Sequence, residues 1–139
     1  MRSSRWIPLF FAVAACSWMP HWACHYYRLE TDSSFVVGAW EFSRTDSVLS
    51  MLAYSGLIAL NLASVVVARP RPLAALLSGI GHSIIGTLHV QRLARPFRFE
   101  VFDHPWSQSA SAREVAIVLG FGVICLAVAW ITRPRNFTE

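Results

Sequence analysis

The sequence contains no lysine and few acidic residues. Twelve arginines are its only basic side chains besides five histidines, and eight Asp and Glu residues oppose them. Charged residues make up 14% of the 139 residues, and four long stretches contain none of them. These stretches are residues 6–27, 47–68, 73–91 and 115–132. Apolar runs of this length indicate a protein that is embedded in a membrane.

Each uncharged stretch is close to the ~20 helical residues that cross a hydrocarbon core about 30 Å thick. Backbone groups cannot stay unpaired in lipid, so each stretch should be a helix. We therefore predict an all-α integral membrane four-helix bundle with antiparallel, up-down-up-down helices. Its outer loops should lie near residues 28–46 and 92–114, with about 20 residues each. With about 80 of the 139 residues in the four stretches, no room remains for a separate soluble domain, so residues 1–139 should form a single transmembrane domain. No internal repeat is evident.

The arginines predict the orientation. Three short sites beside the apolar stretches carry paired arginines: Arg2 and Arg5, Arg69 and Arg71, and Arg133 and Arg135. The positive-inside rule places these sites in the cytoplasm, which puts both termini inside. Seven of the eight acidic residues then lie in the outer loops. The use of arginine without any lysine fits a GC-rich genome. We expect a multi-pass protein of a bacterial inner membrane. Arginines at helix ends give no reason to expect nucleic-acid binding.

Cysteine is rare and gives no disulfide framework. Cys16, Cys24 and Cys125 are scattered, and none belongs to a CxxC pair. Residues 13–16, Val-Ala-Ala-Cys, resemble a loose lipobox, so cleavage and lipidation at Cys16 is one reading of the first stretch. The apolar character continues beyond Cys16, which favours a retained helix.

Polar residues within the stretches indicate a pocket. Two sets share a helix face by their spacing: Ser50, Tyr54, Asn61 and Ser64, and Ser78, His82, Gly86 and His89. The short turn at 69–72 makes the second and third helices neighbours, so the two faces should meet. An ionisable residue inside a span marks a functional site by default. We therefore predict an outward-facing polar pocket between the first three helices, with these ligand-binding candidates: Tyr54, Asn61, His82 and His89.

Histidines also allow a redox or metal site. Five of them could contribute ligands to haem, copper or zinc: His21, His25, His82, His89 and His104. The spacing of His21 and His25 alone is not specific. The opposing interpretation is structural, since Ser, Asn and His hydrogen-bond membrane helices together and glycines let backbones approach closely. Five glycines lie in the third and fourth stretches: Gly79, Gly81, Gly86, Gly120 and Gly122.

The outer loops are rich in aromatic residues, which favours partner binding. Four aromatic side chains are candidates for docking a partner: Trp40, Phe99, Phe102 and Trp106. Alternation around Phe99 predicts a short extended segment with Arg98 and Glu100 on its other side. The two loops could then form a common outer cap. The leading hypothesis is a binding or accessory subunit of a membrane complex or homo-oligomer. Motifs such as GxSxG and HExxH are missing, so a self-contained enzyme is not favoured.

One family resemblance rests on residues before the second helix. His25 and Glu30 are followed by the segment from Trp40 to Ser47, which contains Glu41, Asp46 and Ser47. This order is similar to that of the sterol-isomerase and sigma-2-receptor group, and it covers about a tenth of the chain. The resemblance implies a four-helix bundle with both ends cytoplasmic that binds a small ligand or lipid, or isomerises it. The acids within the second and third helices of that group are missing, with Asn61 and Thr87 as neutral stand-ins.

Overall fold

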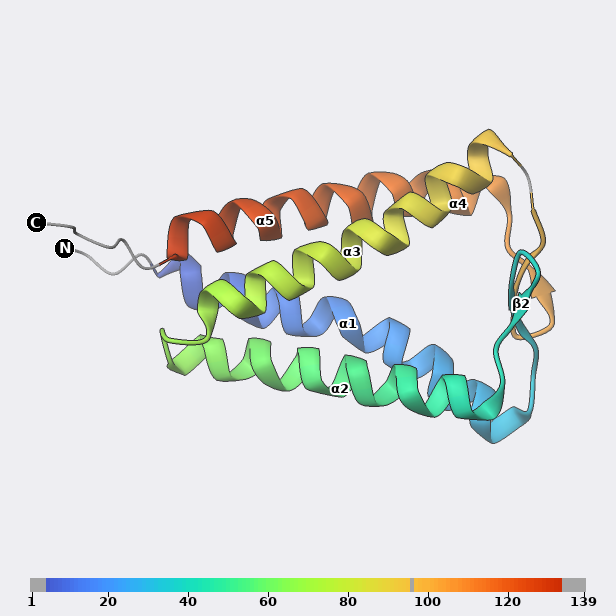
Figure 1. Ribbon diagram of the computed structural model, residues 1–139, viewed down its shortest axis with the longest axis horizontal. Helices are drawn as coiled ribbons and strands as arrows, with labels where there is room; N and C mark the ends of the chain where they lie inside the picture. Colours follow the sequence, from blue (N-terminus) through green and yellow to red (C-terminus); the bar gives the residue numbers. More distant parts are fainter. Residues whose placement is uncertain (1–4, 96, 134–139) are drawn as a thin grey trace, which may run out of the picture.

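The computed structural model describes residues 5–95 and 97–133. Arg2 and Arg135, which belong to the predicted cytoplasmic sites, lie outside the described residues. The chain forms long helices joined by two small β-hairpins (Figure 1). The elements are α1 (Trp6–Thr31), β1 (Phe35–Val37), β2 (Trp40–Glu41), α2 (Arg44–Val66), α3 (Arg71–Ala94), β3 (Phe99–Val101), β4 (His104–Pro105), α4 (Gln108–Glu114), the π-helical turn η1 (Val115–Leu119) and α5 (Gly120–Thr132).

The helices extend beyond the uncharged stretches, so the connecting segments are shorter than the predicted outer loops. Backbone hydrogen bonding does not require apolar side chains, and polar caps set the boundaries here. Ser43 and Asp46 form a capping box at the start of α2, where each side chain accepts a hydrogen bond from the other residue's backbone N–H. Ser107 caps α4 by accepting from the Ala110 N–H at 3.1 Å. Helix α1 runs without a break past Cys16.

Four helical segments of the described chain are long and apolar enough to cross a membrane. They are α1, α2, α3 and the continuous α4–η1–α5 segment, and their mean hydropathy lies between 1.3 and 2.6. Many large apolar side chains on their outer faces are exposed, among them Leu52, Ile84 and Val123. An apolar surface of this extent indicates a multi-pass membrane protein.

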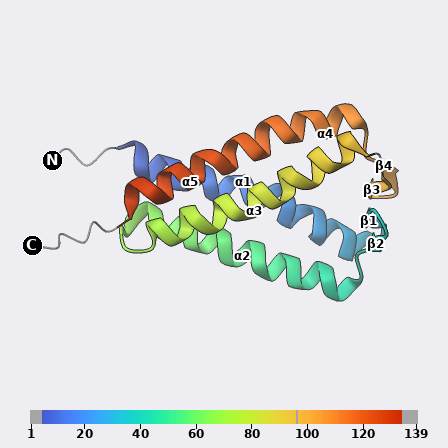
Figure 2. The ribbon, with the colours of Figure 1, turned by 45° about the horizontal axis from the view of Figure 1, so that its top comes forward.

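The helices pack as two hairpins. Helix α1 packs mainly on α2, and α3 packs mainly on α4, η1 and α5. Figures 1 and 2 show the two hairpins close together at the end that holds the α2–α3 turn and apart at the opposite end, where the strands join them. The expectation that α2 and α3 meet along their polar faces therefore holds only near the turn. Arg71 closes this turn, donating to the Ser64 carbonyl at 2.9 Å.

Glycine explains the close packing of the second hairpin. A Cβ on Gly79 would come within 2.7 Å of Leu126, and one on Gly86 within 2.9 Å of Leu119. The backbones of α3 and α5 can therefore approach only because these residues lack side chains. By contrast, a Cβ on Gly120 would meet nothing within 4 Å, so this glycine plays no part in the approach.

The four helical segments close around an apolar cluster at the turn end. Phe11, Ala74 and Ala75 are fully buried there. Partly buried apolar residues of α1, α2 and α5 surround them: Ile7, Phe10, Leu60, Val65, Val128 and Ala129. This cluster joins the hairpins at one end, so their separation at the other end leaves room between them.

A four-stranded antiparallel sheet connects the hairpins at the open end, with the order β2-β1-β3-β4. The predicted extended segment is confirmed as β3, and the two loops do form a common cap. In the central pair, Val36 lies opposite Glu100. Arg98 and Glu100 form an ion pair of 2.7 Å on the outer side of β3, and this contact holds the pKa of Glu100 below its usual value. Asp103 accepts from the Ser34 backbone N–H at 2.9 Å, which lowers its pKa.

Contrary to the sequence reading, the two halves of the chain form a repeat. Each half runs helix, β-hairpin, helix, and equivalent residues lie 64 positions apart. Identical residues at equivalent positions include His25 and His89, Arg28 and Arg92, Phe35 and Phe99, Val37 and Val101, Ser43 and Ser107, Ser47 and Ser111, and Gly56 and Gly120.

Hydrogen bonds repeat in the same way. The Phe42 N–H donates to the Phe35 carbonyl, and its equivalent Trp106 donates to Phe99. The cross-strand bonds from Gly38 to Arg98 and from Phe102 to Ser34 are also equivalent. The sheet is therefore symmetric about the Val36–Glu100 pair, and the halves are parallel repeats whose first helices both run toward the sheet.

Candidate functional site

A cavity of about 810 Å³ lies between the two hairpins, beneath the sheet. Side chains of the sheet and the adjoining residues form its roof: Phe35, Val37, Phe42, Phe99, Val101 and Trp106. Helices α1 and α3 and the η1–α5 segment supply most of its walls, and Tyr54 contributes from α2. Most of this lining is apolar, which suits a lipid-like or aromatic molecule.

The cavity opens sideways, between α1 and the η1–α5 segment. These elements touch at few points, one of which is the stacking of Phe10 on Phe121 with ring centroids 6.0 Å apart. Exposed residues that also line the cavity form the edges of the opening: Val13 and Pro20 on one side, and Ile117 and Ile124 on the other. The sheet covers the end of the cavity, so the exposed part of its lining lies at this apolar side opening. The pocket, which the sequence predicts to face outward, is therefore covered at this end by the sheet.

Polar side chains gather in one part of the cavity, which we call the histidine–tyrosine cluster: His21, His25, Tyr54 and His82. The ring centroids of His21 and Tyr54 lie 5.8 Å apart, as do those of His25 and Tyr54. His21 and His82 lie 6.4 Å apart. Two of the predicted ligand-binding residues, Tyr54 and His82, therefore face the same space as two of the predicted metal ligands.

Trp18 organises this cluster. Its buried ring lies between His82, at a centroid distance of 4.0 Å, and Tyr54, at 5.5 Å. The indole N–H donates to the Ser78 hydroxyl at 3.2 Å, which fixes the ring against α3. A Cβ on Gly81 would come within 2.6 Å of the ring, so this glycine leaves the space that Trp18 fills.

His82 has one nitrogen without a partner. The side chain is 2% exposed, and its Nδ1 lies 2.7 Å from the Ser78 carbonyl oxygen. A carbonyl oxygen can only accept, so Nδ1 carries the proton. The buried Nε2 has no hydrogen-bond partner among the described residues. Buried polar atoms are nearly always paired, so this atom calls for an explanation.

Asn61 does not line the cavity. It is fully buried between α2 and α3, where its amide donates to the Ser78 hydroxyl at 2.9 Å and to the Leu57 carbonyl at 2.8 Å. Asn61 therefore lies in the contact between two helices and not in the cavity where the predicted ligand would bind. The predicted contact between the polar faces of α2 and α3 therefore consists of the Asn61–Ser78 hydrogen bond and of the bonds of Arg71 near the turn.

His89 belongs to a buried His-Arg-Ser group that occurs once in each half. In the second half, Arg92 donates to Ser111 Oγ at 2.6 Å, and His89 Nδ1 lies 3.3 Å from the same oxygen. The guanidinium also donates to the carbonyl oxygens of Ser107 and Trp106. This group joins α3 to the start of α4 and supports the roof. His89 itself lines the wall opposite the histidine–tyrosine cluster.

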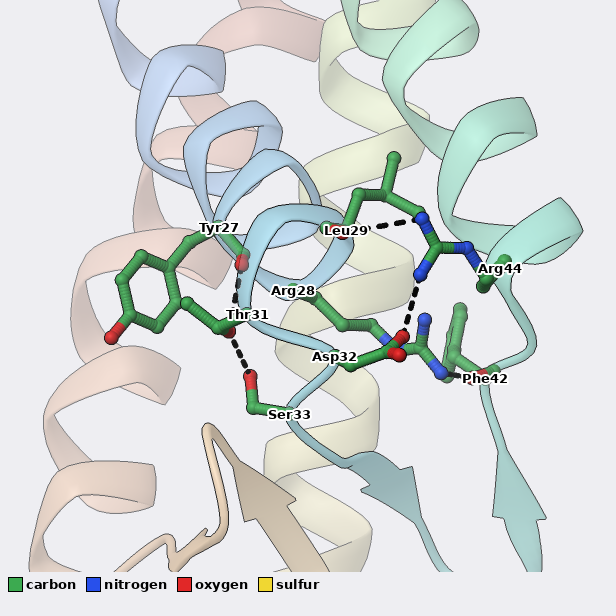
Figure 3. A network of polar contacts seen from close by, with 8 residues as sticks. All are labelled: Tyr27, Arg28, Leu29, Thr31, Asp32, Ser33, Phe42 and Arg44. Carbon is green, nitrogen blue, oxygen red and sulfur yellow. Dashed lines mark hydrogen bonds and ion pairs between the residues drawn. The ribbon is translucent and has the colours of Figure 1, made fainter.

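The equivalent group in the first half is less completely bonded. Arg28 donates to the Phe42 carbonyl oxygen, as Figure 3 shows, but its Nε and Nη1 atoms are buried without partners among the described residues. The nearby exposed ion pair between Arg44 and Asp32, at 2.6 Å, ties α1 to α2 at the surface.

The predicted metal ligands do not assemble into one site. His104 is exposed on β4, outside the cavity lining. Among the described residues, no three His, Cys, Asp or Glu side chains lie close enough together to hold a metal ion. The histidines therefore meet in pairs and with aromatic rings, rather than as a ligand set.

The predicted docking residues divide into three groups. Phe99 and Trp106 line the cavity roof and face inward. Phe102 packs edge-on against Tyr27 with ring centroids 4.6 Å apart. Trp40 alone of the four is largely exposed, at 61%, on the edge strand β2.

Sequence reasoning missed three contributors to the site. Trp18 appeared to be one apolar residue among many, and Glu114 at the end of α4 lines the cavity beside the π-helical turn. Such turns are frequent at functional sites. The buried arginines Arg28 and Arg92 were also missed as roof supports. Their signal was available, because His-x2-Arg-Leu occurs at residues 25–29 and again at 89–93.

Comparison of this chain with protein-family models, with curated protein sequences and with solved structures gives no match. The function is therefore argued from the cavity and its residues.

Proposed function

We propose that this protein is a membrane-embedded binding protein for an apolar or amphipathic small molecule, which reaches the cavity from the bilayer. The observation that carries the proposal is a cavity of about 810 Å³ that is roofed by the sheet and opens between two apolar helix faces. A cavity of this size falls within the range of small-molecule sites. An opening lined by exposed apolar residues favours ligands that partition into lipid.

The proposal includes a topology. Arginines at the turn end, among them Arg5, Arg69, Arg71 and Arg133, favour a cytoplasmic location for both termini, in a cell membrane such as the bacterial inner membrane. The sheet then lies on the outer side. A reporter fused after Glu139 should read cytoplasmic, and one inserted near Ser109 should read external. The opposite pattern would contradict this orientation.

Equivalent glycines of the repeat provide a test of the cavity. Gly120 and Gly56 both have open space around a built Cβ, but only Gly120 lines the cavity. A tryptophan at either position starts from a Cβ with no atom within 4 Å, and Gly120→Trp should place its ring in the opening. The protein is purified in mild detergent, and native mass spectrometry records any bound small molecule.

We expect a bound molecule in the wild-type protein and in Gly56→Trp, and its loss in Gly120→Trp. Equal occupancy in both variants would contradict binding in this cavity. An empty wild-type protein that also fails to take up added apolar probes would contradict the binding function itself.

A second candidate is the accessory subunit of a membrane complex or a homo-oligomer. One observation favours it: Trp40 is exposed on an edge strand whose outer side has no partner strand among the described residues. Aromatic residues and open strand edges are frequent in interfaces. Trp40→Ser should then abolish copurification or self-association in cross-linking experiments without emptying the cavity.

Two other interpretations receive less support. Of the residues that carry the resemblance to the sterol-isomerase and sigma-2-receptor group, His25 and Phe42 line the cavity, whereas Glu30 and Trp40 are exposed outside it. Isomerase chemistry would need a different acid, for which Glu114 is the nearest candidate in the lining. A copper or zinc module would need at least three ligands close together, which the described residues do not provide, whereas a bis-histidine haem would need only a facing pair.

A further inference from the structure

The two halves of the chain contribute equivalent elements to the cavity, so differences between them identify residues that the fold does not require. The residues of the His-Arg-Ser groups are identical in both halves, although the group of the first half makes fewer hydrogen bonds. By contrast, His21 has Ile85 as its equivalent, and Tyr54 has Val118. All four line the cavity. At these two positions the first half is therefore polar and the second half apolar.

His82 provides the second asymmetry, because its equivalent is Trp18. The two rings lie against each other with centroids 4.0 Å apart and planes tilted by 48°, but only His82 lines the cavity. Its Nδ1–H is fixed by the Ser78 carbonyl oxygen at 2.7 Å. In the neutral imidazole, Nε2 is then an acceptor, and it is buried without a partner among the described residues. What this atom lacks is a hydrogen-bond donor.

We propose that the cavity binds an amphipathic alcohol, with one hydroxyl group donating its hydrogen bond to Nε2 of His82. This inference rests on the proposed binding function and specifies the ligand class. A single hydroxyl suits the cluster because the His21 ring, 6.4 Å from His82 between centroids, and the Tyr54 ring, 5.8 Å from His21, carry groups that can donate to its oxygen. The body of the molecule is apolar and extends past Ile85 and Val118 toward the side opening.

The test uses farnesol and its methyl ether as probes. The ether keeps the apolar chain and the oxygen but has no hydroxyl hydrogen. Tritiated probes are titrated against the full-length protein in nanodiscs, and binding is read by scintillation proximity. We expect farnesol to bind about tenfold more tightly than the ether, a difference equivalent to about 1.4 kcal/mol. This size is typical of leaving one buried polar atom without its partner.

Two variants test which residue gives the preference for farnesol over its methyl ether. His82→Phe keeps a ring against Trp18 and Phe121 but removes Nε2, so it should bind both probes alike, at the affinity of the ether. His104→Phe, on the exposed strand β4, should retain the tenfold preference. If His82→Phe does not fold, the comparison of the two probes on the wild-type protein still decides the question. The ¹⁵N resonance of Nε2 gives a second readout, because it should shift when farnesol binds and not when the ether binds.

Equal binding of the two probes by the wild-type protein would overturn the alcohol assignment while leaving the binding function intact. A preference for farnesol that persists in His82→Phe would overturn the role of Nε2. Failure of both probes to bind, with an empty purified protein, would overturn the binding function and the alcohol assignment together.

Discussion

Removal of Arg92 should destabilise the protein much more than removal of its equivalent in the first half. The Arg92 guanidinium is buried and donates to Ser107 O at 3.1 Å, to Ser111 Oγ at 2.6 Å and to the carbonyl oxygens of Trp106 and Phe97. A hydrogen bond to a charged group contributes about 1.5–3 kcal/mol, and the bonds of one guanidinium are not additive. We expect Arg92→Met to lower the free energy of unfolding by about 3 kcal/mol.

Arg28→Met is the matched control. Arg28 donates to one backbone carbonyl, of Phe42, and its Nε and Nη1 atoms are buried without partners among the described residues. Methionine would remove that bond but would also relieve the cost of the unpaired polar atoms, so the expected loss is about 1 kcal/mol or less. SDS-induced unfolding in mixed micelles, followed by circular dichroism, measures both variants. An equal loss for the two variants, or a larger loss for Arg28→Met, would refute this account of the roof.

Two further predictions concern packing and pH. Gly86→Ala should destabilise the contact between α3 and η1 by about 1–2 kcal/mol, because its Cβ would lie 2.9 Å from Leu119, whereas Gly120→Ala should stabilise its helix by up to about 1 kcal/mol. The same unfolding assay measures both, and a shared sign would contradict the packing described here. Because the folded-state pKa of Asp103 is lowered by its bond from Ser34, the stability it contributes is present above its unfolded pKa and lost as pH falls through the folded pKa. Acidification below about pH 4 should therefore weaken the cap in the wild-type protein more than in Asp103→Asn, as measured by hydrogen exchange of the strands, and equal weakening would argue against this bond.

The helices could be predicted from the sequence because each one corresponds to a long run of consecutive residues without charge. The extended segment at β3 was also predictable, since Phe99 and Val101 alternate with charged residues. Helix boundaries were less accessible, because polar caps such as Ser43 with Asp46 extend helices beyond their apolar portions. These are all properties of neighbouring residues.

The cavity was not predictable in the same way, because it depends on which helices pack together. The short turn between α2 and α3 indicated neighbours, but the glycines at 79 and 86 bring α3 against α5 instead. A helical projection does not distinguish Asn61 from His82, yet Asn61 is buried between two helices and His82 lines the cavity. The repeat was present in the sequence, and its detection would have predicted that the two His-Arg-Ser groups occupy equivalent places in the fold.

Photolabelling in nanodiscs tests the central claim most directly, namely that a ligand enters the cavity between the hairpins from the bilayer. A diazirine derivative of farnesol is activated in the presence of the full-length protein, and labelled peptides are sequenced by mass spectrometry. The account predicts labels on cavity residues such as Tyr54, Ile85 and Val118, and their loss when unlabelled farnesol is added in excess. Labels confined to the outer helix faces, on residues such as Leu52 and Ile84, and unaffected by competitor, would contradict it.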